Sequence, residues 1–129
     1  AATQIDPTLP QANLYLGQFY YENVKYKEAE PYLQRAAADQ PKSAQLLTAL
    51  ANTQLQNGEA DLALANARKV SSLSNHKQFA VCHLIAAQAL SGKGQDDEIA
   101  KEYKEYLKEA PDSALAPRVK DALAKLGSK

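Results

Sequence analysis

Residues 10–43, PQANLYLGQFYYENVKYKEAEPYLQRAAADQPKS, decide the fold of this chain. Apolar and small residues recur there at steps of three and four in two separate runs, which is the period of a helix face and not of a strand. A short polar break at 22–25 separates the runs, and Pro41 ends the second run because proline cannot continue a helix. The stretch therefore predicts two helices in a hairpin. The marking positions are Leu16, Gly17 and Tyr20 in the first run, and Ala29, Leu33 and Ala36 in the second.

The same hairpin pattern recurs along the chain at a fixed period. A period of this size indicates an array in which each unit is one supersecondary element. The third unit is displaced, since Gly58 and Gly94 are 36 residues apart, so two residues, about Gln78-Phe79, are expected to be inserted before it. The pairs separated by 34 residues are Pro7 and Pro41, Gly17 and Ala51, and Ala29 and Ala63.

This pattern resembles the tetratricopeptide repeat (TPR), whose unit is a helix–turn–helix of about 34 residues. Gly17 matches the small residue of the first helix, and Ala29 matches the alanine early in the second helix, where the two helices cross closely. Leu33 takes the bulky position, Ala36 the next small one and Pro41 that of the closing proline. The resemblance covers about residues 10–111, and it implies a right-handed superhelix whose concave face is lined by the first helix of each unit.

The predicted fold class is all-α, an α-solenoid of antiparallel helix hairpins with about three repeats, seven helices and a C-terminal capping helix. A polar outer face on that last helix is what a solenoid needs at its end. The whole of 1–129 is expected to form one domain. Its expected parts are 1–9 as the tail of a truncated upstream repeat, 10–43, 44–77 and 78–112 as repeats, and 113–127 as the capping helix.

Composition narrows the classes of function. Lys+Arg and Asp+Glu are 15 each, so the chain lacks the basic excess of a nucleic-acid binder. No stretch approaches the 18 or so apolar residues of a membrane span, so membrane insertion is not expected. The single cysteine allows no intrachain disulfide and leaves the compartment open between the cytoplasm and, after removal of a signal peptide, a bacterial periplasm or envelope.

Catalysis, metals and cofactors are not expected. His76 and His83 are seven residues apart with Cys82 beside the latter, whereas a metal site needs three or four ligands. Cys82 is expected to be a small buried hydrophobic residue. The sequence Gly92-Lys93-Gly94 is expected to be a turn, because it lacks the spacing of a phosphate-binding loop.

The resemblance places a nearly uncharged stripe of side chains on the concave face. One amide recurs in it at the same phase of each unit, at Gln18, Asn52 and Gln88. An amide donates and accepts at once, so such a row suits the backbone of an extended peptide. The candidate groove residues are Leu14, Tyr15, Gln18, Tyr21, Thr48, Asn52, Val81, Leu84, Ile85 and Gln88. Leu115 and Arg118 of the capping helix are expected to reach the same groove.

A non-catalytic scaffold that binds a peptide segment or partner protein is the predicted function. One family subtype grips a C-terminal carboxylate with lysine, arginine and asparagine at these phases, but no lysine stands at them here, which argues against that mode. Two alternatives stay open. In the first, the chain is a structural spacer or weakly self-associates through its N-terminal edge. In the second, it is a regulatory appendage of an enzyme whose catalytic domain lies elsewhere.

Overall fold

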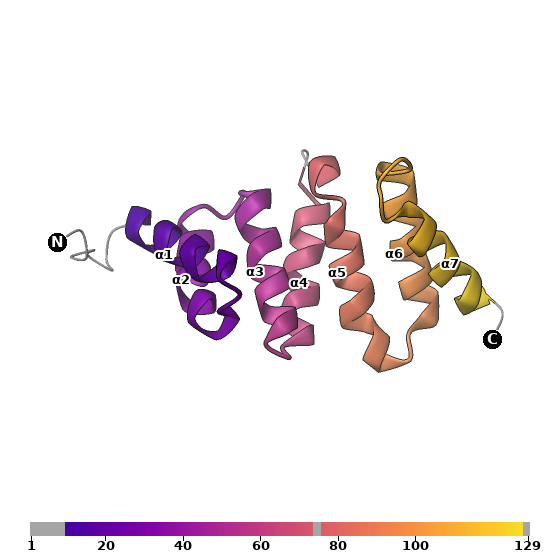
Figure 1. Cartoon of the computed structure of the whole chain (residues 1–129), viewed down its shortest axis with the longest axis horizontal. Helices are drawn as coiled ribbons and strands as arrows, with labels where there is room; N and C mark the ends of the chain where they lie inside the picture. Colours follow the sequence, from indigo (N-terminus) through magenta and orange to yellow (C-terminus); the bar gives the residue numbers. More distant parts are fainter. Residues whose placement is uncertain (1–9, 74–75, 128–129) are drawn as a thin grey trace.

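The computed structural model describes residues 10–73 and 76–127, and this part of the chain forms an all-α helical repeat solenoid. The helices follow one another in an elongated row from the N-terminal to the C-terminal end (Figure 1). None of the described helices combines the length and the apolar character needed to cross a bilayer. The elements are α1 (Pro10–Glu22), α2 (Tyr26–Asp39), α3 (Ala44–Gln56), α4 (Ala60–Ser71), the 3-10 helix η1 (His76–Phe79), α5 (Val81–Leu90), the 3-10 helix η2 (Ser91–Lys93), α6 (Asp96–Glu109) and α7 (Ala116–Gly127).

The turns of the three hairpins share one backbone conformation, as the repeat period of the sequence implies. Val24, Gly58 and Gly94 occupy the same phase and have positive φ values of 61°, 81° and 67°. Glycine adopts this left-handed conformation at little cost, whereas a β-branched residue is strained in it. The residues that follow them have nearly the same dihedrals: Lys25 (φ −98°, ψ 71°), Glu59 (φ −102°, ψ 64°) and Gln95 (φ −102°, ψ 62°).

Within each hairpin the helices cross where the sequence places small residues. A Cβ built on Gly17 would lie 2.9 Å from Leu33 Cδ2 and 3.3 Å from the backbone nitrogen of Leu33, so α1 and α2 touch at this point. In the next unit the same two phases hold Ala51 and Ala67, which are 0% and 1% exposed. The pairing of glycine with leucine and of alanine with alanine keeps the combined volume at each crossing within what close packing allows.

A hydrophobic core runs continuously through the first two hairpins and into α5. Each helix packs against the next along the chain, and α3 also packs directly against α5. The helices α1, α3, α5 and α7 are called here the first-helix layer, because each stands at the first-helix phase of a unit.

The capping helix begins later than the sequence pattern predicts. The capping helix α7 begins at Ala116, three residues later than the predicted start at 113. Ser113 is held in the preceding turn by a 2.8 Å hydrogen bond between its hydroxyl and that of Tyr106, and Pro117 then fits the first turn of the helix. The expectation for residues 1–9 lies outside the described residues.

The inserted residues take a definite shape. Gln78 and Phe79 belong to η1, the 3-10 helix that precedes α5. Phe79 packs against the main core, so the two-residue displacement of the third repeat adds an aromatic ring to the junction between the second and third hairpins.

Candidate functional site

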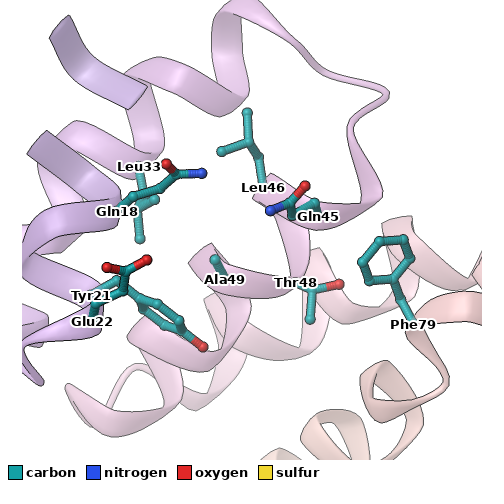
Figure 2. Close-up of a pocket in the computed structure, with 9 residues that line it drawn as sticks. All are labelled: Gln18, Tyr21, Glu22, Leu33, Gln45, Leu46, Thr48, Ala49 and Phe79. Carbon is teal, nitrogen blue, oxygen red and sulfur yellow. The ribbon is translucent and has the colours of Figure 1, made fainter. Parts of the chain in front are cut away.

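A pocket of about 320 Å³ lies between α1 and α3, and we call it the N-pocket. Leu33 of α2 lies beneath it, and Phe79 of η1 stands across it from the side chains of α1 (Figure 2). Its lining residues are Gln18, Tyr21, Glu22, Leu33, Gln45, Leu46, Thr48, Ala49 and Phe79.

Polar groups in the N-pocket are mostly acceptors or amides. The Glu22 carboxylate is the only charged group among its described side chains, and the side chain is exposed. The Thr48 hydroxyl oxygen is buried and has no hydrogen-bond partner, which is uncommon for a buried polar atom. At the edge of the pocket, the Asn52 amide nitrogen donates a 2.9 Å hydrogen bond to the Tyr21 hydroxyl and fixes the position of that ring. The pocket thus offers apolar walls together with unsatisfied polar capacity.

A second pocket, of about 360 Å³, lies between α5 and α7, and we call it the C-pocket. Tyr103 of α6 lies beneath it, and Arg118 of α7 is the only charged residue in its described lining. Most of the other lining side chains are apolar. The lining residues are Leu84, Gln88, Ser91, Tyr103, Leu115, Arg118, Val119 and Ala122.

The two pockets are the same inter-repeat site, formed twice. Six lining residues of each pocket correspond in pairs that are 70 residues apart, which is one 34-residue and one 36-residue period. Both pockets therefore open between neighbouring members of the first-helix layer, with the second helix of the unit beneath. The pairs are Gln18 and Gln88, Tyr21 and Ser91, Leu33 and Tyr103, Gln45 and Leu115, Thr48 and Arg118, and Ala49 and Val119.

The equivalent space between α3 and α5 is filled by Ile85. This residue stands at the phase of Ala49 and Val119, is 5% exposed and belongs to the main core. Beneath it, the phase of Leu33 holds the much smaller Ala67, so the isoleucine side chain has room to enter. The inclusion of Ile85 among the groove residues is therefore corrected by the structure, because its side chain is packed inside and is not available to a ligand.

The other candidate residues divide into two groups. The structure brings Gln18, Tyr21 and Thr48 together in the N-pocket, with Asn52 bonded at its edge, and it brings Leu84 and Gln88 together in the C-pocket. The remaining three line neither pocket: Leu14 is half-buried against the core, Val81 is 41% exposed, and Tyr15 is 58% exposed and stacked on Phe19.

Several pocket residues are not among the candidates from the sequence, and three of them are Glu22, Phe79 and Tyr103. The sequence pattern places Glu22 in the polar break between helices and Phe79 in the insertion. The 70-residue correspondence was available from the sequence and pairs Leu33 with Tyr103. Nothing in the periodicity could have placed Phe79, because it lies in the residues that break the period.

A buried charged cluster on α5 and α6 was also missed. His83 is 5% exposed, its Nδ1 lies 2.8 Å from Glu102 Oε1, and its Nε2 lies 3.1 Å from Glu109 Oε2. Burial alone would lower the pKa of His83, but the hydrogen bonds and negative charges of Glu102 and Glu109 outweigh it and raise the pKa. His83, Glu105 and Glu109 offer ligand atoms within 4.8 Å of one another, as a divalent-metal site would. Because carboxylates already bind both ring nitrogens of His83, we assign the cluster a structural role in which it links α5 to α6.

Cys82 behaves as expected from the sequence. It is 1% exposed and lies in the main core. Burial, together with the charges of Glu109 and Glu102, raises the pKa of its thiol to about 12. Because the thiolate is the reactive form of cysteine, this side chain is a packing residue and not a nucleophile.

No family model matches the sequence, and no curated protein matches it either. Solved structures do share its fold. The first TPR domain of Spaghetti (RPAP3), bound to the HSP90 peptide SRMEEVD, has a TM-score of 0.78 at 17% identity, over 98% of this chain and 96% of that one. The type III secretion translocator chaperone SycD of Yersinia enterocolitica has a TM-score of 0.81 at 18% identity, over 98% and 88%.

A third solved structure is the second TPR domain of human RPAP3 in complex with the HSP70 peptide SGPTIEEVD. Its TM-score is 0.75 at 18% identity, over 94% of this chain and 100% of that one. The chain therefore has the fold of tetratricopeptide repeat domains along nearly its whole length, as its sequence pattern predicted.

Proposed function

We propose that this chain is a non-catalytic protein-interaction module that binds an extended peptide segment of a partner along its first-helix layer. The observation that carries the proposal is the pair of register-equivalent pockets, each with apolar walls and a few polar groups. Pockets of about 300 Å³ or more with this composition are typical of ligand sites. Gln18 and Gln88 stand at the same phase of the two pockets and can each donate to and accept from a peptide backbone.

Two further observations support this function. TPR domains of the same fold have been solved with bound chaperone peptides, namely SRMEEVD from HSP90 and SGPTIEEVD from HSP70. Among the described side chains that line the N-pocket there is no cation, and the one charged group is Glu22. A carboxylate-rich chaperone tail is therefore not the ligand we assign to the N-pocket.

A random dodecapeptide library displayed on phage provides the direct test. Wild-type protein should enrich a peptide family, and a variant with both pockets blocked, Ala49→Phe with Leu84→Glu, should lose its binding by fluorescence polarisation. Ala65 is exposed on α4 and lines neither pocket, so Ala65→Phe is the matched control and should bind as wild type does. No enrichment by the folded wild-type protein, or equal binding by the blocked variant, would reject the proposal.

Self-association is the second candidate, and one observation favours it. Tyr15 and Phe19 of α1 are 58% and 47% exposed and stack on each other, which presents an aromatic surface outside both pockets. Exposed aromatic surface of this kind marks contact sites more often than isolated apolar residues do. Sedimentation velocity across a hundredfold concentration range should show a concentration-dependent mass that Tyr15→Ser with Phe19→Ser removes. An unchanging monomer mass would exclude this alternative.

A further inference from the structure

The pockets differ in the sign of their charge, and this inference rests on the proposed function. Among the lining residues whose side chains the structure describes, Glu22 is the single charged group of the N-pocket and Arg118 is the single charged group of the C-pocket. Neither forms an ion pair with a side chain that the structure describes, a set that leaves out those of residues 76 and 77. Asp121, three residues after Arg118, pairs with Lys125 at 3.2 Å.

We propose that the two pockets are charge-selective subsites of opposite sign. The N-pocket takes a lysine or arginine side chain of the partner, and the C-pocket takes an apolar side chain next to a carboxylate. The partner is therefore a peptide segment with a basic residue at one anchor and an apolar–acidic pair at the other.

The N-pocket has the parts that a long basic side chain requires. Such a side chain lays its aliphatic stem on apolar surface and keeps its charged end near water or a counter-charge. Leu33, Ala49 and Phe79 supply the apolar surface, and the Phe79 ring also offers a face for a cation. The Glu22 carboxylate supplies the counter-charge, and Figure 2 shows it on the α1 side, facing α3 across the pocket. The unpartnered Thr48 hydroxyl can accept a hydrogen bond from an ammonium or guanidinium group.

The C-pocket has the complementary parts. Leu84, Leu115 and Val119 form apolar walls above Tyr103 and suit an aliphatic or aromatic side chain. A guanidinium group presents a planar fork of donors that matches a carboxylate in two parallel hydrogen bonds, so Arg118 favours a carboxylate at the pocket mouth. Thr48 stands at the equivalent position of the N-pocket and carries no charge, which is why the two sites differ in the ligand they select.

The filled space between the pockets sets the spacing of the two anchors. The N-pocket and C-pocket are two steps apart in the first-helix layer. Directly packed helices are about 8–10 Å apart, and in this layer only α3 and α5 pack extensively, so the pocket centres are separated by at least about 20 Å. An extended chain advances about 3.3 Å per residue, which corresponds to about six residues or slightly more between the anchors. Ile85 occupies the intervening space, so the residues between the anchors cross α3 and α5 without inserting a side chain.

The experiment uses the same dodecapeptide library and measures which charges are enriched and at what spacing. Wild-type protein should enrich peptides with a basic residue about six positions from an apolar–acidic pair. Glu22→Lys should convert the basic preference into an acidic one and leave the other anchor unchanged, and Arg118→Glu should do the converse. For a wild-type-selected peptide measured by fluorescence polarisation, each reversal should weaken binding about tenfold, because like charges are then brought together.

Matched controls and rescue separate the subsites from general charge effects. Glu28→Lys and Lys120→Glu reverse exposed charges on α2 and α7 outside the pockets and should leave affinity within about twofold. A peptide with its basic anchor changed to glutamate should recover affinity for Glu22→Lys alone. Peptides that bind but show no charge pattern, or whose pattern survives both reversals, would overturn the subsite assignment and leave the proposed function intact. Failure to enrich any peptide would instead reject the proposed function itself.

Discussion

Gly17→Ala should destabilise this protein even though alanine is the better helix former. The new Cβ would lie 2.9 Å from Leu33 Cδ2 and 3.1 Å from Leu33 Cγ, and the leucine is 0% exposed, so it cannot swing away freely. Overpacking of this kind costs about 1–3 kcal/mol. Replacing glycine by alanine within a helix stabilises the helix by about 1 kcal/mol. The net loss in the free energy of unfolding is therefore up to about 2 kcal/mol, measured by urea denaturation with far-UV circular dichroism and tyrosine fluorescence.

Gly17→Ala should become stabilising when Leu33 is replaced by the smaller alanine. Leu33→Ala alone should cost about 2–5 kcal/mol because it leaves a cavity. Adding Gly17→Ala then recreates the Ala51–Ala67 pair of the second hairpin, so the double variant should be about 1 kcal/mol more stable than Leu33→Ala. The coupling energy of this cycle should be about 1–3 kcal/mol in favour of the double variant.

Ala65→Gly is the control that measures helix propensity without packing. Ala65 is exposed in the middle of α4, so Ala65→Gly measures the alanine–glycine difference without packing and should cost about 1 kcal/mol. If Gly17→Ala stabilised the wild-type protein by that same amount, α1 and α2 would not be in contact at Gly17. The crossing in the first hairpin would then differ from the one described.

Three further predictions concern single positions. Val24→Gly should raise the free energy of unfolding by about 1 kcal/mol in urea denaturation, because Val24 has a φ of 61° where the other hairpins have glycine, and its side chain is 67% exposed; a lower urea midpoint would show that the valine is not strained. Because the pKa of His83 is raised above its ordinary 6.5, its charged form stabilises the fold below that pH and this contribution is lost as the pH rises through the folded pKa. The stability difference between wild type and His83→Gln should therefore be largest below pH 6.5 and shrink above it, and a difference that grew with pH would contradict the ion-pair assignment. With a thiol pKa of about 12 and 1% exposure, Cys82 should resist Ellman's reagent at pH 8 in the folded protein and react fully in denaturant, and rapid labelling of the folded protein would show that α5 opens locally.

The fold could be predicted from the sequence because local rules and the repeat period agree. Gly17, Ala51 and Ala87 stand at one phase, and each is buried at a helix crossing, so a pattern repeated three times outweighs the weak signal of any one copy. The turn glycines Gly58 and Gly94 have the positive φ that their positions predict.

The site could be predicted only in part, because helical phase gives the direction of a side chain but not the space in front of it. Ile85 and Ala49 stand at the same phase, yet one is a core residue and the other lines a pocket. The difference comes from the residue beneath, since Ala67 leaves room for isoleucine whereas Leu33 already fills that place. Predicting a pocket therefore requires the residues of two packed helices together, and the pattern of residues along one helix is not sufficient.

The two inserted residues add an aromatic ring to the N-pocket. In a strict 34-residue array, the junction before the third hairpin would repeat the junction before the second, and no aromatic ring would be added there. The insertion lies in η1 and places Phe79 against the core and along the N-pocket, and the described lining of the C-pocket includes no phenylalanine. Phe79→Ala should therefore weaken a basic-anchored peptide and leave an isolated apolar–acidic anchor unaffected. Equal weakening of both would mean that Phe79 acts by stabilising the whole array, and that the N-pocket draws its selectivity from Glu22 alone.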